Sequence, residues 1–220
     1  AMFMLPLYYQ VVRGQSALHA GLLLAPQGLG AAIMMPIAGK RTDDVGAGKI
    51  VLGGLAFLFL GMLGYTQVGA NTSFWFLGGC QLFMGFGMGA SMMPAMSAAY
   101  QTLQRNQLAR ATTALNIIQR VGGSIGTALL AVVLTHQLTS RLPSNAEGGL
   151  AAAQSVPAAD RARVAPDIAE AFGHTFWWAA GIIALAVIPA LLLPRHKPEP
   201  PEAPAPGEPA ADDVPMLIEV

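Results

Sequence analysis

The chain has 220 residues, of which 54% are hydrophobic and only 11% are charged. Soluble domains carry roughly 25% charged residues, so a globule of this composition could not cover its surface in water, and a lipid bilayer is the expected solvent. The 12 basic and 12 acidic residues cancel, which excludes the basic footprint of a nucleic-acid-binding protein.

The expected spans follow from long stretches without acidic or basic side chains. Residues 1–12 are apolar and indicate a truncated first transmembrane helix. At 1.5 Å per residue, about 19 residues cross the roughly 30 Å of hydrocarbon. Because backbone groups in lipid must be paired within their own segment, the predicted fold is all-α, a polytopic transmembrane helix bundle. Its complete spans are expected at about 20–38, 50–69, 74–97, 111–135 and 174–194.

Two segments are expected to differ from the spans of this bundle, which extends over residues 13–195. Residues 137–173 are rich in Ala, Pro and Ser and are expected to form an external loop, with a short helix near 166–172. Residues 196–220 combine Pro, Ala and Gly with acids and have no Lys or Arg after Lys197. They are expected to form a disordered acidic tail.

The distribution of cations predicts the orientation, because cytoplasmic loops near span ends are enriched in Lys and Arg. The opposite side carries fewer cations, and the 137–173 loop there balances its arginines with acids. We therefore expect the cation-rich side, including the C-terminal tail, in the cytoplasm. The cations on that side are Lys40, Arg41, Lys49, Arg105, Arg110, Arg195 and Lys197.

The most specific pattern is the charged turn between the first two complete spans, residues 39–49. Gly39 can let the helix end close to its neighbour, and Asp43 can face the positive N-terminus of the next helix. Gly46 suits a turn, while Arg41 and Lys49 can reach the anionic inner leaflet. The pattern predicts a tight, charged turn between two spans, which can set the topology of the chain.

Polar residues interrupt the span 111–135 at Asn116, Gln119 and Arg120. Arg120 stands in the middle of this span, where an ionised group costs about 3 kcal/mol on insertion scales. We expect these residues to serve gating and Arg120 to face a packed polar neighbour or a water-filled path. The alternative is that Arg120 extends towards the inner interface and anchors the helix.

A stripe of methionines marks the span 74–97. Gln81, Met84, Met88 and Met92 follow one another at spacings of three and four, which aligns them on one helix face. Methionine is flexible and polarizable, and Gln81 offers an uncharged donor and acceptor. The stripe predicts a promiscuous substrate surface. Ordinary packing against helices or lipid is the alternative.

Two patterns imitate enzyme or cofactor sites. Residues 122–126 fit the G-x-S-x-G pattern of serine hydrolases, and residues 85–90 imitate a dinucleotide fingerprint, but both lie in predicted spanning helices without the required strands. The lone Cys80 cannot build a thiolate metal cluster. No enzyme activity, cofactor or metal is expected. The glycines spaced by four instead predict close helix packing; they are Gly85 with Gly89 and Gly122 with Gly126.

The 39–49 loop resembles the loop signature of the major facilitator superfamily, in which Gly, three residues, Asp, two residues and Gly precede basic positions. Asp44 and Ala47 depart from it, because basic residues are common there, so the resemblance implies a weakened gate. The alternative is a loop that only sets the topology. Segment 111–133 resembles the matching helix of the fourteen-span drug:proton antiporter branch of that superfamily. The opening of the chain also resembles this branch, in Leu5-Pro6-Leu7-Tyr8-Tyr9-Gln10, Arg13-Gly14, Ala20-Gly21-Leu22 and Pro26.

The resemblance runs from residue 1 to about 195. It implies the C-terminal half of a major facilitator fold, with the last six helices of a protein of two similar halves and the first of them truncated. The missing N-terminal half would hold the carboxylates that usually couple protons. The first and fourth helices of such a half line the central cavity, so the resemblance adds Tyr9 and Gln10 to Gln81 and the methionines as substrate-lining residues.

The implied function is proton-coupled efflux of small amphipathic or cationic drugs by alternating access in a bacterial inner membrane. The implied partners are a drug-like small molecule, protons, the lipid bilayer and the missing N-terminal half. Two alternatives stay open. One is a non-transporting membrane partner or truncated product, and the other is an importer of a specific solute from the same superfamily.

Overall fold

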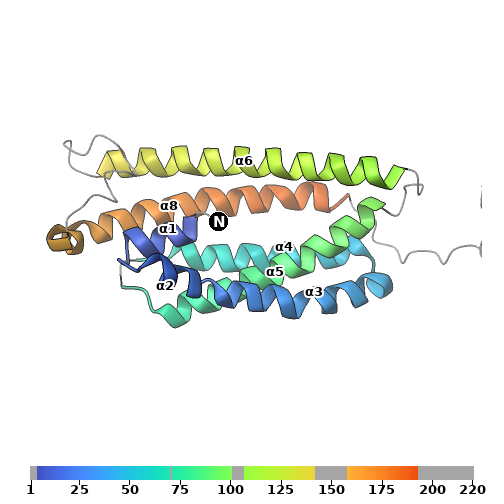
Figure 1. Ribbon diagram of the computed structural model, residues 1–220, viewed down its shortest axis with the longest axis horizontal. Coiled ribbons are helices and arrows are strands. Elements are labelled where there is room, and N and C mark those ends of the chain that lie inside the picture. The colour runs from blue at the N-terminus through green and yellow to red at the C-terminus, as the bar shows by residue number, and fades with distance from the viewer. Residues whose placement is uncertain (1–3, 70, 101–106, 142–157, 193–220) are drawn as a thin grey trace, which may run out of the picture.

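The computed structural model describes residues 4–69, 71–100, 107–141 and 158–192, and the described residues form helices and the turns between them, with no strand among them. This confirms the predicted all-α class. Figure 1 shows long helices running side by side. The helices are α1 Met4–Val11, α2 Ala17–Leu22, α3 Ala25–Val45, α4 Ala47–Thr66, α5 Phe74–Tyr100, α6 Leu108–Arg141 and α8 Ala158–Ala190.

Helix α5 is the centre of the packing, because it lies against both α3 and α4. Helix α4 also packs against α8, and α8 in turn packs against α6. In Figure 1, α6 forms one edge of the bundle and α3 the opposite edge. The buried residues of α6 are Leu130, Leu134 and Leu138, spaced by four, so a single stripe of this long helix is covered within the chain.

Glycines set the distance between α5 and its neighbours. A Cβ added at Gly85 would come within 3.0 Å of the backbone nitrogen of Ala31, and one at Gly89 within 3.1 Å of the Ala31 Cα, both in α3. On the α4 side, a Cβ at Gly87 would meet the backbone nitrogen of Leu58 at 2.6 Å. Backbones this close allow the van der Waals packing that holds helices together in lipid. The predicted packing role of Gly85 and Gly89 is confirmed.

The second glycine pair makes no such contact within the described residues. A Cβ added at Gly122 or Gly126 would meet no atom within 4 Å. Both glycines lie on α6 outside the stripe that α8 covers. Spacing alone predicted the contact, but a small-residue pair approaches a neighbour only where a neighbouring helix faces it.

The expected span 20–38 is broken. Helix α2 ends at Leu22 and α3 begins at Ala25, with a turn at residues 23–24. Pro26 has no backbone N–H, so the carbonyl four residues earlier cannot be paired in a continuous helix. The N–H of Gln27 bonds instead to the carbonyl of Leu24 at 3.1 Å. Two helices therefore replace the single predicted one.

The predicted loop at 39–49 is mostly helix. Helix α3 runs through Gly39 to Val45, and Gly46 alone joins it to α4, with φ of 92°. The expected helix end at Gly39 was wrong, because Lys, Arg and Thr continue a helix and no proline follows. The hydroxyl of Thr42 donates to the carbonyl of Ala38 at 2.6 Å. Gly46 is the turn residue, in the left-handed region that glycine tolerates.

The predicted external loop at 137–173 is shorter than expected. Helix α6 continues to Arg141, and α8 starts at Ala158 and passes Pro166 without ending. Alanine is the strongest helix former, which favours helix over loop in this Ala-rich stretch. Arg141 and Glu170 join the two helices by an ion pair of 2.6 Å. Residues 142–157, the acidic tail 196–220 and Arg105 lie outside the described residues.

Five helical segments among the described residues are long and apolar enough to cross a bilayer. The first combines α2 and α3 across their break. The third has no acidic or basic residue, and the last two have theirs towards their ends or at Arg120. The segments are Ala17–Thr42, Ala47–Thr66, Phe74–Ser97, Leu108–Arg141 and Arg163–Leu191.

Gly85→Ala tests the close approach of α3 and α5. The added methyl meets backbone of α3, so we expect a loss of about 1–3 kcal/mol, the range for overpacked cores. The matched control is Gly79→Ala on the same helix, where a Cβ meets nothing within 4 Å. The thermal midpoint of the purified protein in detergent, measured by size-exclusion chromatography after heating, should fall for Gly85→Ala alone. Equal midpoints for both variants would contradict the packing role.

Candidate functional site

A buried polar cluster joins three helices at one end of the bundle. Tyr9 comes from α1, Tyr65 from α4 and Gln81 from α5. All three side chains are buried, and Gln81 is 0% exposed. Buried polar side chains in a bundle this apolar carry a desolvation penalty unless they bond to each other or to the backbone. We define these three residues as the polar cluster.

Each hydrogen bond of the polar cluster has a defined donor and a defined acceptor. Gln81 Nε2 donates to the hydroxyl of Tyr9 at 2.9 Å and to the carbonyl of Leu23 at 2.9 Å. The hydroxyl of Tyr65 donates to the carbonyl of Leu77 at 3.0 Å. That bond uses the only proton of the Tyr65 hydroxyl, so in its 3.2 Å contact with Tyr9 it must accept.

The helix break supplies one member of this network. In a continuous helix the carbonyl of Leu23 would accept from the N–H of Gln27, but that N–H bonds to Leu24 at the turn. The Leu23 carbonyl is thereby left for Gln81. Non-helical backbone at membrane depth is tolerated where protein supplies the missing partners, which is the case here. Gln81 thus ties the break in the α2–α3 pair to α5.

Aromatic rings hold the polar cluster from the side of α8. The ring of Tyr65 lies 5.4 Å from that of Phe176, and the ring of Tyr8 lies 5.8 Å from that of Phe172 in an edge-on arrangement. The hydroxyl of Tyr8 donates to the carbonyl of Gly69 at 3.0 Å. Edge-on and tilted pairs of this kind are favourable beyond the apolar area they bury. Ring contacts with α8 therefore support the polar cluster in addition to its own hydrogen bonds.

The structure divides the residues predicted to line the substrate site. Tyr9, Gln81 and Met84 are in the core, and Met84 is 2% exposed beside Gly61. Gln10, Met88 and Met92 are exposed, the two methionines at 44% and 41%. One buried group and one exposed group thus replace the continuous surface that was predicted.

The two groups lie at different positions along α5. Tyr9 accepts a hydrogen bond from Gln81, so the buried group lies beside the described part of α1. Met88 and Met92 are about 10 Å and about 16 Å further along α5 at 1.5 Å per residue. Helical spacing shows which residues share a face, but not which of them a neighbouring helix contacts.

The predicted gating residues on α6 are all exposed: Asn116, Gln119 and Arg120 lie away from the stripe that faces α8. The described chain therefore provides no packed polar neighbour for Arg120. The exposed face also holds large apolar residues, and it is a candidate surface for contact outside this chain. Those residues include Ile117, Ile118, Val121, Ile125 and Val132.

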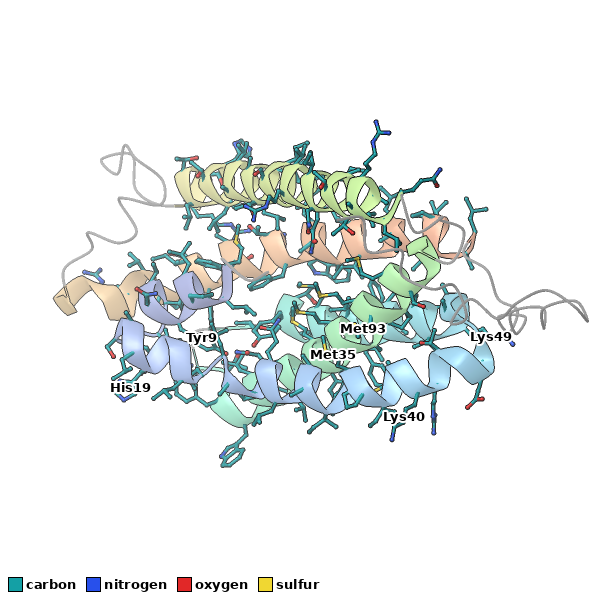
Figure 2. The ribbon with its side chains drawn as sticks, turned by 45° about the vertical axis from the view of Figure 1, so that its right-hand side comes forward. Tyr9, His19, Met35, Lys40, Lys49 and Met93 are labelled. Carbon is teal, nitrogen blue, oxygen red and sulfur yellow. The ribbon has the colours of Figure 1, made fainter. Side chains whose placement is uncertain are left out.

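The charged end of the α3–α4 pair lies far from the polar cluster. Figure 2 shows Lys40 and Lys49 at one end of the bundle and Tyr9 and His19 at the other. Arg41 and Lys49 are exposed, as expected for residues that reach a membrane surface or solvent. Gly46 forms the turn. The side chain of Asp43 lies outside what the structure describes.

Sequence reasoning missed Tyr65 and the Leu23 carbonyl. Tyr65 ends an apolar span, where a tyrosine is ordinarily interpreted as an interface residue. The break had a visible signal, because Pro26 lies inside the predicted span and proline interrupts the hydrogen bonds of a helix. Only the fold brings Tyr65 within reach of Tyr9, which is 56 positions away in the sequence.

The family model described as Major Facilitator Superfamily matches residues 1–138, which is 138 of 220 residues. The chain belongs to the major facilitator superfamily. The match covers α1 to most of α6, including both halves of the broken helix and the polar cluster. With its five segments of spanning length and apolar composition, this major facilitator chain is an integral membrane protein.

Relatives of this major facilitator chain are named for resistance or transport. It is 36% identical over 211 residues to the Multidrug resistance protein B homolog of Mycobacterium tuberculosis, covering 88% of this chain and 39% of that protein. It is 30% identical over 139 residues to a Tetracycline resistance determinant of Streptomyces rimosus, 63% of this chain and 40% of that protein. It is 25% identical over 137 residues to the Riboflavin transporter RibZ of Clostridioides difficile, 62% of this chain and 30% of that protein. The chain thus spans well under half the length of these relatives.

A double-mutant cycle tests the polar cluster. Tyr9→Phe and Tyr65→Phe each remove a hydroxyl but keep the ring, and each should cost about 1 kcal/mol of unfolding free energy. The two share one hydrogen bond, so the double variant should cost less than the sum. Tyr8→Phe with Tyr65→Phe is the control cycle, because those hydroxyls share no bond, and its costs should add. Stability would be measured by reversible unfolding in detergent. Additive costs for Tyr9 and Tyr65 would contradict the shared bond.

Proposed function

We propose that this chain forms one half of a transporter that exports small amphipathic or cationic compounds in exchange for protons. The observation that carries the proposal is the 36% identity to a protein named for multidrug resistance over 88% of this chain. The identity extends through α6 and α8, beyond the region that the family model matches. Export, proton coupling and drug-like substrates are all part of the proposal.

Alternating access supplies the mechanism. Two helix bundles rock about a site between them, and each bundle provides one wall. In this chain the exposed Gln10 of α1 and the exposed Met88 and Met92 of α5 would form part of that wall. We place Arg120 and its polar neighbours on α6 at the contact with the other half, where gating would act on them. Proton-coupling carboxylates belong to the other half in this proposal.

We further propose that the end of the bundle with Lys40, Arg41 and Lys49 faces the cytoplasm of a bacterial cell, with the acidic tail on the same side. The support is the enrichment of cations in cytoplasmic loops. The end with Tyr9 and His19 then faces outwards (Figure 2). A cysteine at the exposed Asp44 should be closed to a membrane-impermeant thiol reagent in intact cells, and labelling there would reverse the orientation.

Import of a specific solute is the second candidate, and it is supported by the similarity to a riboflavin transporter. Its support is weaker, because the identity is 25% over 62% of the chain, against 36% over 88% for the multidrug resistance homologue. A non-transporting membrane partner is the third. The three functions differ in the direction of substrate movement, or in its absence.

One experiment separates these candidates. The complete coding sequence is expressed in bacteria that lack their main drug pumps, and the cells are loaded with ethidium. The proposal expects faster loss of ethidium than in cells with empty vector, and it expects a protonophore to abolish the difference. Export that survives the protonophore would exclude proton coupling. Equal loss in both cells, repeated with several unrelated compounds, would exclude drug efflux.

The exposed Met88 and Met92 can be tested with a variant and a matched control. Met88→Leu with Met92→Leu keeps size and apolarity but removes the adaptability of the thioether, so fewer compounds should be exported at the wild-type rate. Met84→Leu is the control, because Met84 is buried. This replacement should change the free energy of unfolding by less than about 1.5 kcal/mol and leave the range of exported compounds unchanged. Resistance to a panel of unrelated compounds would be measured at equal protein level. Unchanged resistance to all compounds in the Met88→Leu, Met92→Leu variant would contradict a role of these residues in binding.

A further inference from the structure

Gln81 has a buried acceptor with no partner. Among the described residues, its Oε1 is the buried side-chain oxygen or nitrogen atom for which no hydrogen-bond partner exists. The side chain as a whole is 0% exposed. Buried polar atoms of this kind are rare in native proteins, and each carries a desolvation penalty that a functional partner can relieve.

Reversing the amide does not satisfy this oxygen. In the reversed orientation Oε1 would face the Leu23 carbonyl, which has no proton to donate, so two acceptors would meet. Tyr9 cannot supply a proton either, because its hydroxyl donates to Tyr65 while Tyr65 donates to Leu77. The donor side of Gln81 is therefore committed to Tyr9 and Leu23, and the acceptor side is left over.

This oxygen lies inside the packed helices and not at the lipid-facing surface, because Gln81 is fully buried. Gln81 lies where α1 meets α5 and the break between α2 and α3. In membrane transporters, broken helices with backbone carbonyls turned to side chains are typical of sites where substrate binds near the interface of the two repeats. Tyr9 of α1 accepts a hydrogen bond from Gln81 here, so movement of α1 away from α5 would break that bond and open the side of the amide that faces α1.

We propose that Gln81 Oε1 is a specificity-determining acceptor for substrates that carry an N–H or O–H donor, uncovered when α1 separates from α5. The inference rests on the proposed export function and names the chemical class that the site prefers. A carbonyl oxygen bonds to donors only, so it favours amino-substituted aromatic cations over cations without N–H or O–H groups. Sites built to bond a substrate N–H or O–H discriminate far more strongly against an analogue lacking it than apolar pockets do.

Two lipophilic cations provide the test. Ethidium carries two aromatic amino groups, whereas tetraphenylphosphonium has no N–H or O–H donor. Gln81→Met replaces the amide with an apolar chain of similar length. In cells that express the complete coding sequence, we expect this variant to lower the rate of ethidium export about tenfold more than that of tetraphenylphosphonium. An equal fall in the export rates of both cations, at normal protein level, would assign Gln81 to helix packing or to a bound water and would overturn the inference.

Two further variants separate the acceptor from the rest of the network. Tyr9→Phe removes a partner of Nε2 and leaves Oε1 intact, so the ratio of ethidium to tetraphenylphosphonium export should stay at the wild-type value. Gln81→Glu keeps acceptor oxygens and loses the amide donors, and the ratio should stay at or above wild type. A ratio below the wild-type value in Gln81→Glu would overturn the inference. This second variant keeps the test valid if Gln81→Met fails to reach the membrane. If the wild-type protein exports neither cation nor any other compound, the proposed export function has failed instead.

Discussion

The arrangement at the buried end of the bundle depends on the turn at residues 23–24. Pro26, which has no backbone N–H, lies in the first turn of α3, and the N–H of Gln27 bonds to Leu24 instead of Leu23. This leaves the Leu23 carbonyl outside the helical hydrogen bonds. Gln81 bonds to that carbonyl and to Tyr9, so α1, the broken helix and α5 meet at one amide. Lipid offers no water to satisfy a freed carbonyl, so the break and the amide require each other.

Helix α5 has two tasks that use different residues. Its glycines let α3 and α4 approach to backbone distance on two sides, which fixes the three helices as one unit. Its third side holds the polar amide under α1 and, further along, exposed thioethers. A rigid helix that carries both kinds of residue can present a binding surface without being rearranged itself. The neighbouring α1 is buried along most of its described length and contributes Tyr9 to the contact with Gln81.

The sequence was sufficient for the fold class, because uncharged stretches of spanning length have few structural solutions in a bilayer. It was also sufficient for Gly85 and Gly89, which face a neighbour. The helix beyond Gly39 and the length of α8 past Pro166 follow helix propensity, which a search for uncharged stretches does not weigh. The sequence was insufficient where tertiary packing decides. Gln81 and Met88 share a helix face, but Gln81 is buried and Met88 is exposed in the described chain, a difference that their spacing does not report.

The single-residue link at Gly46 has a mechanical consequence. The two long helices α3 and α4 are joined without slack, through a residue whose φ of 92° would strain any side chain other than glycine. The glycines of α5 also bring its backbone close to both α3 and α4. A displacement of the charged turn is therefore expected to shift α3, α4 and α5 together, because one residue separates the first two and close backbone contacts join the third to them.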